Sequence, residues 1–359
     1  MRFVCGNQPL EFDHSLWTSI LGHFTGGSTG GSRLVADQCI VVTQRKGDPP
    51  LSAWGLYGHD DQLGTLNLLT PENTLATAKG EIQTGIRVAL DPPLDALLIP
   101  SIGRRKLTQT IVRVGDNIPA HDDVLEFNTQ IGAQWDGLRH MTYHKSGVFY
   151  DNTTIDQISC DNANPDALGI DAWVKRGSIA GRGVLLDYYA YSQHAKREYG
   201  LINCAHAITY QDLVDCAKYQ GIEIREGDLP FVRSGFWVGY RRLTEEEKTG
   251  WGLWAWKRRE QWRDVARWLR ESDIAACAGD APAWEKVPSW EWPASAGLEG
   301  LSLHEIMLDG WGMAIGELFD LETLSEVCKG NKRGSFFVAS PPLNVRGGAS
   351  SPPNCIAIF

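Results

Sequence analysis

The alternation of short apolar runs with helix signals most constrains the fold of this chain. Residues 183–187, 229–233 and 335–339 are short apolar runs bounded by turn residues, a pattern typical of buried strands. Helix signals lie before and between these runs, and we find no internal repeat. We therefore predict a mixed α/β fold.

Two helix starts can be read directly from the residues. Thr70-Pro71-Glu72 supplies an N-cap, a proline in the first turn and an acidic residue in the first turn. Thr209, with Asp212 three residues later, predicts a second capped helix, and Gly221 predicts its end. Both helices are therefore expected at defined positions.

The length of 359 residues is sufficient for a substantial hydrophobic core. A patch rich in glycine and serine at residues 26–32 predicts a loop-rich N-terminal extension over residues 1–50. No Pro/Ser-rich linker divides the remainder, so residues 51–359 are expected to form one domain.

Charge and composition restrict the partners and the location. A net charge of −10 argues against nucleic acid as the main partner. No apolar run approaches the roughly 20 residues needed to cross a bilayer, and the first residues show no signal-peptide pattern. The eight cysteines are scattered, which is typical of reduced and mostly buried thiols. We predict a cytoplasmic protein that contacts neither nucleic acid nor membrane.

One segment, residues 130–140, concentrates polar side chains. Gln130, Gln134 and Asp136 have the same parity in an extended segment, so their side chains would share one face. His140 follows through Gly137, which permits a bend. A carboxylate and an imidazole that converge on a pocket can bind a divalent metal or form a general-base pair. The alternative is a half-buried strand whose polar residues satisfy local hydrogen bonds.

Two other groups contain candidate ligands. Ser302 can cap a short helix that carries His304 in its first turn. Glu317 ends an apolar stretch, and a buried carboxylate there would need a partner; the alternative is a surface glutamate after a turn. The cluster His121-Asp122-Asp123 predicts a solvated loop rather than a metal site.

The segments around residues 130–140 and 302–318 together resemble the cyclase superfamily that includes bacterial kynurenine formamidase and isatin hydrolase. The family signature His-x-Gly-Thr-His-x-Asp-x-Pro-x-His falls on residues 130–140, which read Gln-Ile-Gly-Ala-Gln-Trp-Asp-Gly-Leu-Arg-His. Further matching segments are residues 63–71, 181–187, 279–282 and 341–345. The resemblance implies a swivelling β/α fold around a mixed central sheet, usually assembled as a homodimer or homotetramer.

The resemblance also implies roles for single residues. In the hydrolases of the family, motif histidines and the motif aspartate bind a divalent metal, and a later histidine and glutamate complete the site. Asp136 matches the ligand aspartate, Glu317 matches the late glutamate, and His304 is matched with the late histidine. His140 matches the final motif histidine, which acts as acid/base.

Gln130 and Gln134 stand where the family has two metal-binding histidines. An amide oxygen is a weak, hard ligand, so affinity for zinc should fall by orders of magnitude. A site of Asp136, His304, Glu317 and the Gln134 amide could still hold a divalent metal such as Mn²⁺ or Zn²⁺. The alternative is a hydrogen-bonding pocket without metal.

These alternatives predict different chemistry. With a metal, we expect hydrolysis of an amide, lactam or lactone bond, with His140 moving a proton and Gln130, Gln134 and Trp135 contacting the substrate. Without a metal, Asp136 and His140 would serve as the acid/base pair of a natural-product cyclase, dehydratase or isomerase. A third alternative is a binding protein without catalysis.

Overall fold

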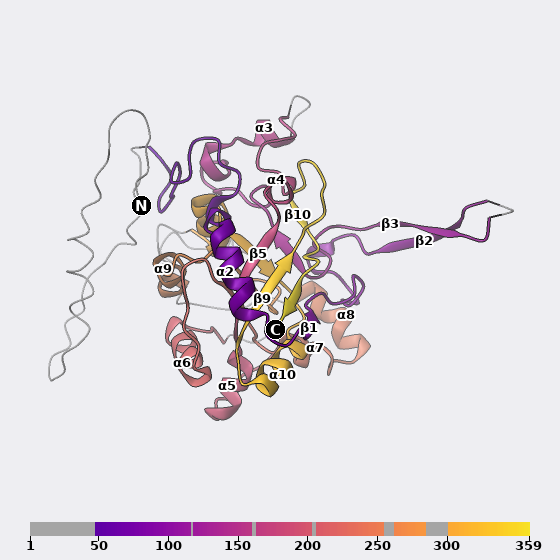
Figure 1. Cartoon of the computed structure of the whole chain (residues 1–359). Coiled ribbons are helices and arrows are strands. Elements are labelled where there is room, and N and C mark those ends of the chain that lie inside the picture. Colours follow the sequence, from indigo (N-terminus) through magenta and orange to yellow (C-terminus); the bar gives the residue numbers. More distant parts are fainter. Residues whose placement is uncertain (1–46, 116–117, 160–162, 203–205, 255–261, 285–300) are drawn as a thin grey trace. The chain divides into compact units, whose positions relative to one another are not determined.

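The computed structural model describes residues 47–115, 118–159, 163–202, 206–254, 262–284 and 301–359 (Figure 1). The chain divides into two units, Met1–Cys39 and Ile40–Phe359, and every described residue belongs to the second unit. The predicted extension over residues 1–50 lies outside the described residues up to residue 46. Its boundary therefore stays a prediction.

The described residues form both helices and strands, as the sequence predicts. The strands are β1 (Arg87–Ala89), β2 (Thr108–Arg113), β3 (His121–Glu126), β4 (Gln134–Asp136), β5 (Ile179–Leu186), β6 (Leu229–Val232), β7 (Ala276–Gly279), β8 (Ala314–Glu317), β9 (Ser335–Ser340), β10 (Ser350–Ser351) and β11 (Ile356–Ile358). The α-helices are α2 (Pro71–Glu81), α3 (Ile155–Ser159), α4 (Asp171–Lys175), α5 (Tyr188–His194), α6 (Tyr210–Gln220), α7 (Phe236–Tyr240), α8 (Glu245–Trp254), α9 (Trp262–Glu271) and α10 (Glu322–Asn331), and a π-helix covers Glu305–Gly310.

A nine-stranded mixed sheet forms the centre of this unit, in the order β1-β11-β9-β5-β6-β7-β8-β4-β10. The strands β5, β6, β7 and β8 are parallel neighbours, and the remaining pairs are antiparallel. The three strands expected from apolar runs are β5, β6 and β9. The fold is therefore the predicted mixed α/β fold with a mixed central sheet.

The predicted helix signals act at the expected positions. The side chain of Thr70 accepts a hydrogen bond from the backbone of Asn73 at the start of α2. Thr209 and Asp212 form a reciprocal capping box on α6, and Gly221 ends that helix in the left-handed conformation. These local signals need no tertiary contact, which explains why the sequence predicts them.

Both faces of the sheet are covered by hydrophobic residues. Leu186 and Val232 belong to a core that includes residues of α6, α9 and the π-helix. Leu185 and Phe231, their neighbours on β5 and β6, belong to a second core that includes residues of α10. Because successive side chains of a strand alternate between faces, each central strand contributes to both cores.

Two predictions from composition concern membranes and disulfides. Among the described residues, no helix combines the length and the apolarity needed to cross a bilayer. Four cysteines lie in the described part of the chain as buried free thiols: Cys216, Cys277, Cys328 and Cys355.

A hairpin made of β2 and β3 projects from the rest of this unit (Figure 1). All residues of both strands are exposed. His121, Asp122 and Asp123 lie in β3, so the predicted loop there is wrong, although the predicted solvation is correct. The cross-strand pairing of β2 and β3 explains the difference.

Candidate functional site

The adjacent strands β4 and β8 place three polar side chains on one face of the sheet. The register pairs Gln134 with Glu317, and Asp136 lies two residues further along β4. Trp135, between them, belongs to the core on the α10 side. Side-chain alternation therefore directs Gln134, Asp136 and Glu317 to the opposite face. All three are buried.

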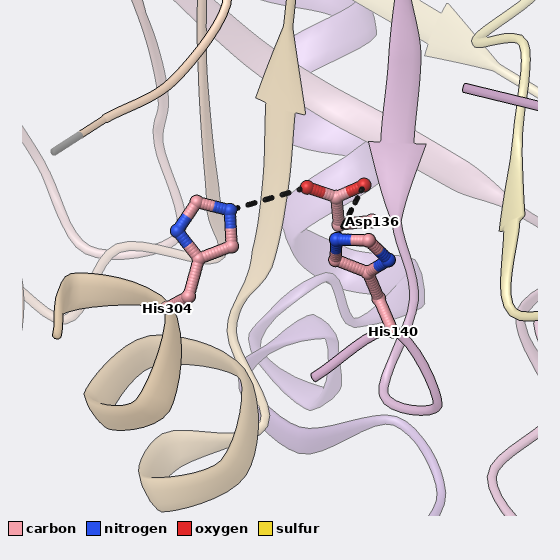
Figure 2. Close-up of side chains that lie close together, drawn as sticks. All are labelled: Asp136, His140 and His304. Carbon is pink, nitrogen blue, oxygen red and sulfur yellow. Dashed lines mark ion pairs between the residues drawn. The ribbon is translucent and has the colours of Figure 1, made fainter. Parts of the chain in front are cut away.

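His304 reaches this face from the segment that opens the π-helix. Ser302 Oγ accepts from the backbone N–H of Glu305, and the Glu305 carboxylate accepts from the backbone and hydroxyl of Ser302. Ser302 is thus the predicted cap. This arrangement holds His304 Nε2 3.5 Å from Asp136 Oδ2 and 3.4 Å from Glu317 Oε1. Figure 2 shows the first of these contacts.

His140 enters the site after a sharp turn at Gly137. The Gly137 backbone donates to Ala349 O at 3.0 Å, and a Cβ at this position would lie 2.8 Å from the same oxygen. The backbone of His140 then donates to Gly137 O. His140 Nε2 lies 4.0 Å from Asp136 Oδ1 (Figure 2), and its side chain is 21% exposed. His140 is therefore more exposed than Asp136, His304 or Glu317.

Both glutamines predicted for the site are hydrogen-bonded within it. Gln134 Nε2 donates to Glu317 Oε2 at 2.9 Å. Gln130 Nε2 lies 2.6 Å from Asp136 Oδ1 and 2.7 Å from His140 Nδ1. Each amide nitrogen thus faces a carboxylate, where the family signature has an imidazole.

The extended segment expected over residues 130–136 is shorter in the structure. Only residues 134–136 form a strand, and residues 130–133 form a turn and bend. The Asn128 side chain accepts from Gln130 N, and its carbonyl accepts from Ile131 N. An asparagine side chain can stabilise such a turn by hydrogen-bonding to the backbone, which competes with strand pairing. Gln130 consequently reaches Asp136 through the turn rather than by shared parity.

Electrostatics favour the ionised form of Asp136. Complete burial raises the pKa of this carboxyl, but His140, His304 and Arg104 outweigh burial and hold its pKa below the ordinary value. Arg104 also donates to Gln130 O at 3.3 Å. No motif drew attention to Arg104 in the sequence, because its role depends on a contact across 26 residues.

The site residues fit a divalent metal ion. Asp136, His140 and His304 each offer one ligand atom within 4.8 Å of the others. The 3.5 Å and 3.4 Å separations from His304 to Asp136 and Glu317 are close to the ~3.4 Å between two atoms bound tetrahedrally at ~2.1 Å. Asp136 Oδ2 is buried and accepts no well-formed hydrogen bond from the described residues, which suits a ligand position.

Two sequence expectations are changed by burial. Trp135 has 0% exposure, donates from Nε1 to Ser340 Oγ and packs edge-on against Phe319. Its predicted contact with a substrate is wrong, because strand alternation directs it into the opposite core. Glu317 is 5% exposed, which excludes the alternative of a surface glutamate.

A family model and one solved structure agree with this fold. The model of the family described as "Putative cyclase" matches residues 105–286. A crystal structure described as a novel cyclase is 28% identical, with a TM-score of 0.73, over 86% of this chain and 100% of its own. Isatin hydrolase A from Ralstonia solanacearum is 15% identical (TM-score 0.49; 81% of this chain and 98% of its own). A predicted metal-dependent hydrolase from Bacillus stearothermophilus is 14% identical (TM-score 0.42; 77% and 98%). No curated protein matches the chain.

Proposed function

Because the chain belongs to the "Putative cyclase" family, we propose that it is an enzyme that hydrolyses an amide, lactam or lactone bond of a small molecule. The observation that carries the proposal is the convergence of two buried carboxylates and two histidines, of which His140 is partly exposed. Asp136, His304 and Glu317 form its buried part, and His140 forms its exposed edge.

The proposed reaction forms a bond from a water oxygen to the substrate carbonyl carbon and breaks the bond from that carbon to nitrogen or oxygen. Asp136, His304 and Glu317, with the amide of Gln134 as a further candidate, would hold a divalent ion such as Mn²⁺ or Zn²⁺. When bound, such an ion lowers the pKa of a water and polarises a carbonyl. His140, at the exposed edge, takes the proton that the attacking water loses and delivers it to the leaving nitrogen or oxygen.

The two glutamines support a substrate that carries an N–H group. Gln130 Oε1 and Gln134 Oε1 are buried and accept no hydrogen bond from the residues that the structure describes. A buried acceptor without a donor is unfavourable by about 1–3 kcal/mol. An amide or lactam N–H would satisfy such an oxygen, so amides and lactams are favoured over lactones.

A second candidate is a metal-independent cyclase, dehydratase or isomerase that uses Asp136 and His140 as its acid/base pair. The observation that favours it is the orientation of the glutamine amides. Gln130 and Gln134 direct their N–H groups at Asp136 and Glu317, and thus give each carboxylate a donor without a cation. Such a preorganised pocket suits proton transfers on a small natural product.

A substrate panel tests these candidates. Purified protein is assayed against aromatic and aliphatic amides, lactams and lactones, with added Mn²⁺ and with a chelator, beside the variant Asp136→Ala. Turnover that the chelator and Asp136→Ala both abolish supports the metal-dependent hydrolase. Turnover that resists the chelator supports the second candidate. Turnover that survives in Asp136→Ala contradicts both, and binding without turnover would point to a non-catalytic protein.

We also propose that the protein is a homodimer or homotetramer. The support is the projecting β2–β3 hairpin, whose Ile111 and Val124 are 61% and 60% exposed on opposite faces. A lone two-stranded hairpin is marginally stable in water, so a partner surface would stabilise it. Light scattering after size exclusion should show an oligomer that Ile111→Asp with Val124→Asp dissociates. Leu75→Asp, at an exposed leucine of α2, is the control. The cytoplasmic location of the protein stays a prediction.

A further inference from the structure

Arg104 lies beside the candidate site and is joined to it through Gln130. Its Nη1 donates to the carbonyl oxygen of Gln130 at 3.3 Å and to Ser101 Oγ at 3.2 Å. The side chain of Gln130 in turn donates to Asp136 at 2.6 Å and lies 2.7 Å from His140 Nδ1. The positive charge of Arg104 also acts on the buried carboxyl of Asp136. Gln130 therefore links the guanidinium to the residues that we propose act on the substrate.

Arg104 differs from the other buried or half-buried arginines of the described chain, because no described carboxylate pairs with it. Arg139, which also lacks a carboxylate, donates instead to three backbone carbonyl oxygens. The remaining arginines of this kind each lie 2.7–3.4 Å from a carboxylate oxygen: Arg182, Arg233, Arg267, Arg270 and Arg333. A half-buried cation beside the site thus lacks an anion within the described residues.

The free edge of the Arg104 guanidinium is the edge that binds a carboxylate with two hydrogen bonds. Both described partners of Arg104 lie on Nη1, which carries two of the five N–H groups. Nε and Nη2 make no hydrogen bond to the described residues and are not among the buried unpaired atoms, so they are open to solvent. Arg233 divides its donors in the same way. Its Nη1 binds Asp187, while Nε and Nη2 bind the two oxygens of Glu322 at 2.9 and 2.8 Å.

The backbone that carries Arg104 is strained. Ile102 has a φ of 59°, a left-handed conformation that β-branched residues rarely adopt. Its side chain is 66% exposed, so burial of the isoleucine does not compensate the strain. Gly103 follows with a φ of 66°, and the backbone of Arg104 donates back to Ser101 O. Strain of this kind is concentrated at ligand-binding positions, and this turn places Arg104 beside Gln130.

We propose that Arg104 is a specificity-determining residue that binds a carboxylate of the substrate separate from the bond that is cleaved. The substrate class is then an amide or lactam that carries an additional carboxylate. The geometry suits two separate groups, because Arg104 contacts the backbone of Gln130, whereas Asp136 contacts its side chain. A single guanidinium in a protein of net charge −10 fits a carboxylate better than a phosphate dianion. The substrate class rests on the proposed hydrolase function, whereas the carboxylate site does not.

Calorimetric titration with benzoate tests this site without turnover. The full-length protein is titrated with benzoate and with its neutral isostere benzamide, both with added Mn²⁺ and with a chelator. We expect benzoate to bind at least about tenfold more tightly under both conditions, the factor that one hydrogen bond to a charged group provides. Equal affinities would overturn the proposal, as would benzoate binding that requires Mn²⁺. An inactive substrate panel leaves this result intact, because no substrate is cleaved in the titration.

Variants assign the binding to Arg104. In Arg104→Met, the Kd for benzoate should rise at least about tenfold and that for benzamide should stay the same, a selectivity that general structural damage would not produce. In Arg104→Lys, the Kd should rise less, because lysine keeps the charge but lacks the paired donors. Arg105→Met is the matched control, since Arg105 pairs with Glu126 at the surface, and it should leave both Kd values unchanged.

Three outcomes would contradict the proposal. Benzoate affinity that is the same in Arg104→Met and the wild type would remove Arg104 as the ligand. Phenyl phosphate that binds the wild type more tightly than benzoate, and loses this advantage in Arg104→Met, would assign the site to phosphates. If Arg104→Met does not fold, the comparison rests on Arg104→Lys, and an unchanged preference for benzoate over benzamide in that variant would also overturn the proposal.

Discussion

Two groups of buried charges in this protein differ in how completely their hydrogen bonds are satisfied. Arg233 donates from Nε and Nη2 to Glu322 at 2.9 and 2.8 Å, and from Nη1 to both oxygens of Asp187. Ser325 also donates to Asp187. In the candidate site, by contrast, Asp136 Oδ2 accepts no well-formed hydrogen bond from the described residues.

The difference indicates a structural role for the first group and a functional role for the second. The cluster around Arg233 joins the end of β6 to the start of α5 and to α10, and it gives both oxygens of each carboxylate a hydrogen bond, so it holds the fold together. The candidate site keeps acceptor atoms of Asp136, Gln130 and Gln134 unused, which is unfavourable until a ligand arrives. Substitutions should therefore affect stability in the first group and activity in the second.

The largest expected effect on stability is at Arg233. Arg233→Met should lower the free energy of unfolding by about 3–5 kcal/mol, because it leaves the buried Asp187 and the partly buried Glu322 without a cation. Urea denaturation followed by circular dichroism measures the change. Arg346→Met is the matched control, since Arg346 pairs with Asp166 at the surface, and its loss of stability should be much smaller. Equal losses would contradict the comparison.

At the candidate site the balance should reverse. Asp136→Asn should lower turnover about 10³-fold, or about 4 kcal/mol of transition-state stabilisation, because it removes the central negative charge. Its unfolding free energy should change by less than about 1 kcal/mol, since the variant removes a buried charge and keeps the shape. The kinetic assay and urea denaturation are run on the same protein. A large stability loss with normal turnover would make Asp136 a structural residue.

Local features of the fold could be predicted from the sequence, and long-range pairing could not. The capping residues Thr70, Thr209 and Gly221 act through contacts within a few residues, so they are visible in the sequence. The order of the nine strands depends on pairing between distant segments, as where β4 joins β8. The strands β2 and β3 were not predicted, because neither has a buried face and the apolar pattern that predicts strands arises from burial.

The same distinction holds at the site. Parity predicted that Gln134 and Asp136 share a face, and the apolar stretch before Glu317 predicted its burial. The turn at Gln130 and the contribution of Arg104 were not predictable, because the first depends on the Asn128 side chain and the second on a tertiary contact. Trp135 was assigned to the substrate from its place in the motif, although its parity directs it away.

A third test uses pH on a structural cluster. Burial raises the pKa of Asp228 from 3.8 to about 6, although Arg182 pairs with it. The folded state therefore holds this proton more tightly than the unfolded chain, so the contribution of Asp228 to stability is greatest below pH 4 and falls by up to about 3 kcal/mol as pH rises to about 6. Asp228→Asn should flatten that part of the pH profile of unfolding. An unchanged slope would remove Asp228 as its source.

The smallest expected effect on stability is that of metal binding, which should involve the candidate site and not the cluster around Arg233. If Asp136, His304 and Glu317 hold a divalent ion, Mn²⁺ at about 100 times its Kd should raise the free energy of unfolding by about 2.7 kcal/mol. His304→Ala should abolish the increase, whereas His194→Ala, at a histidine stacked on Tyr219, should keep it.

Gln134→His sharpens this last test. It restores an imidazole at a position where the amide nitrogen now faces Glu317, so Mn²⁺ and Zn²⁺ should bind more tightly than in the wild type. Arg233→Met should leave the metal effect in place, because its cluster offers no vacant acceptor. A wild type that Mn²⁺ does not stabilise, beside a Gln134→His variant that it does, would mean that the glutamines have replaced the metal. The metal-independent acid/base enzyme would then be the function to pursue.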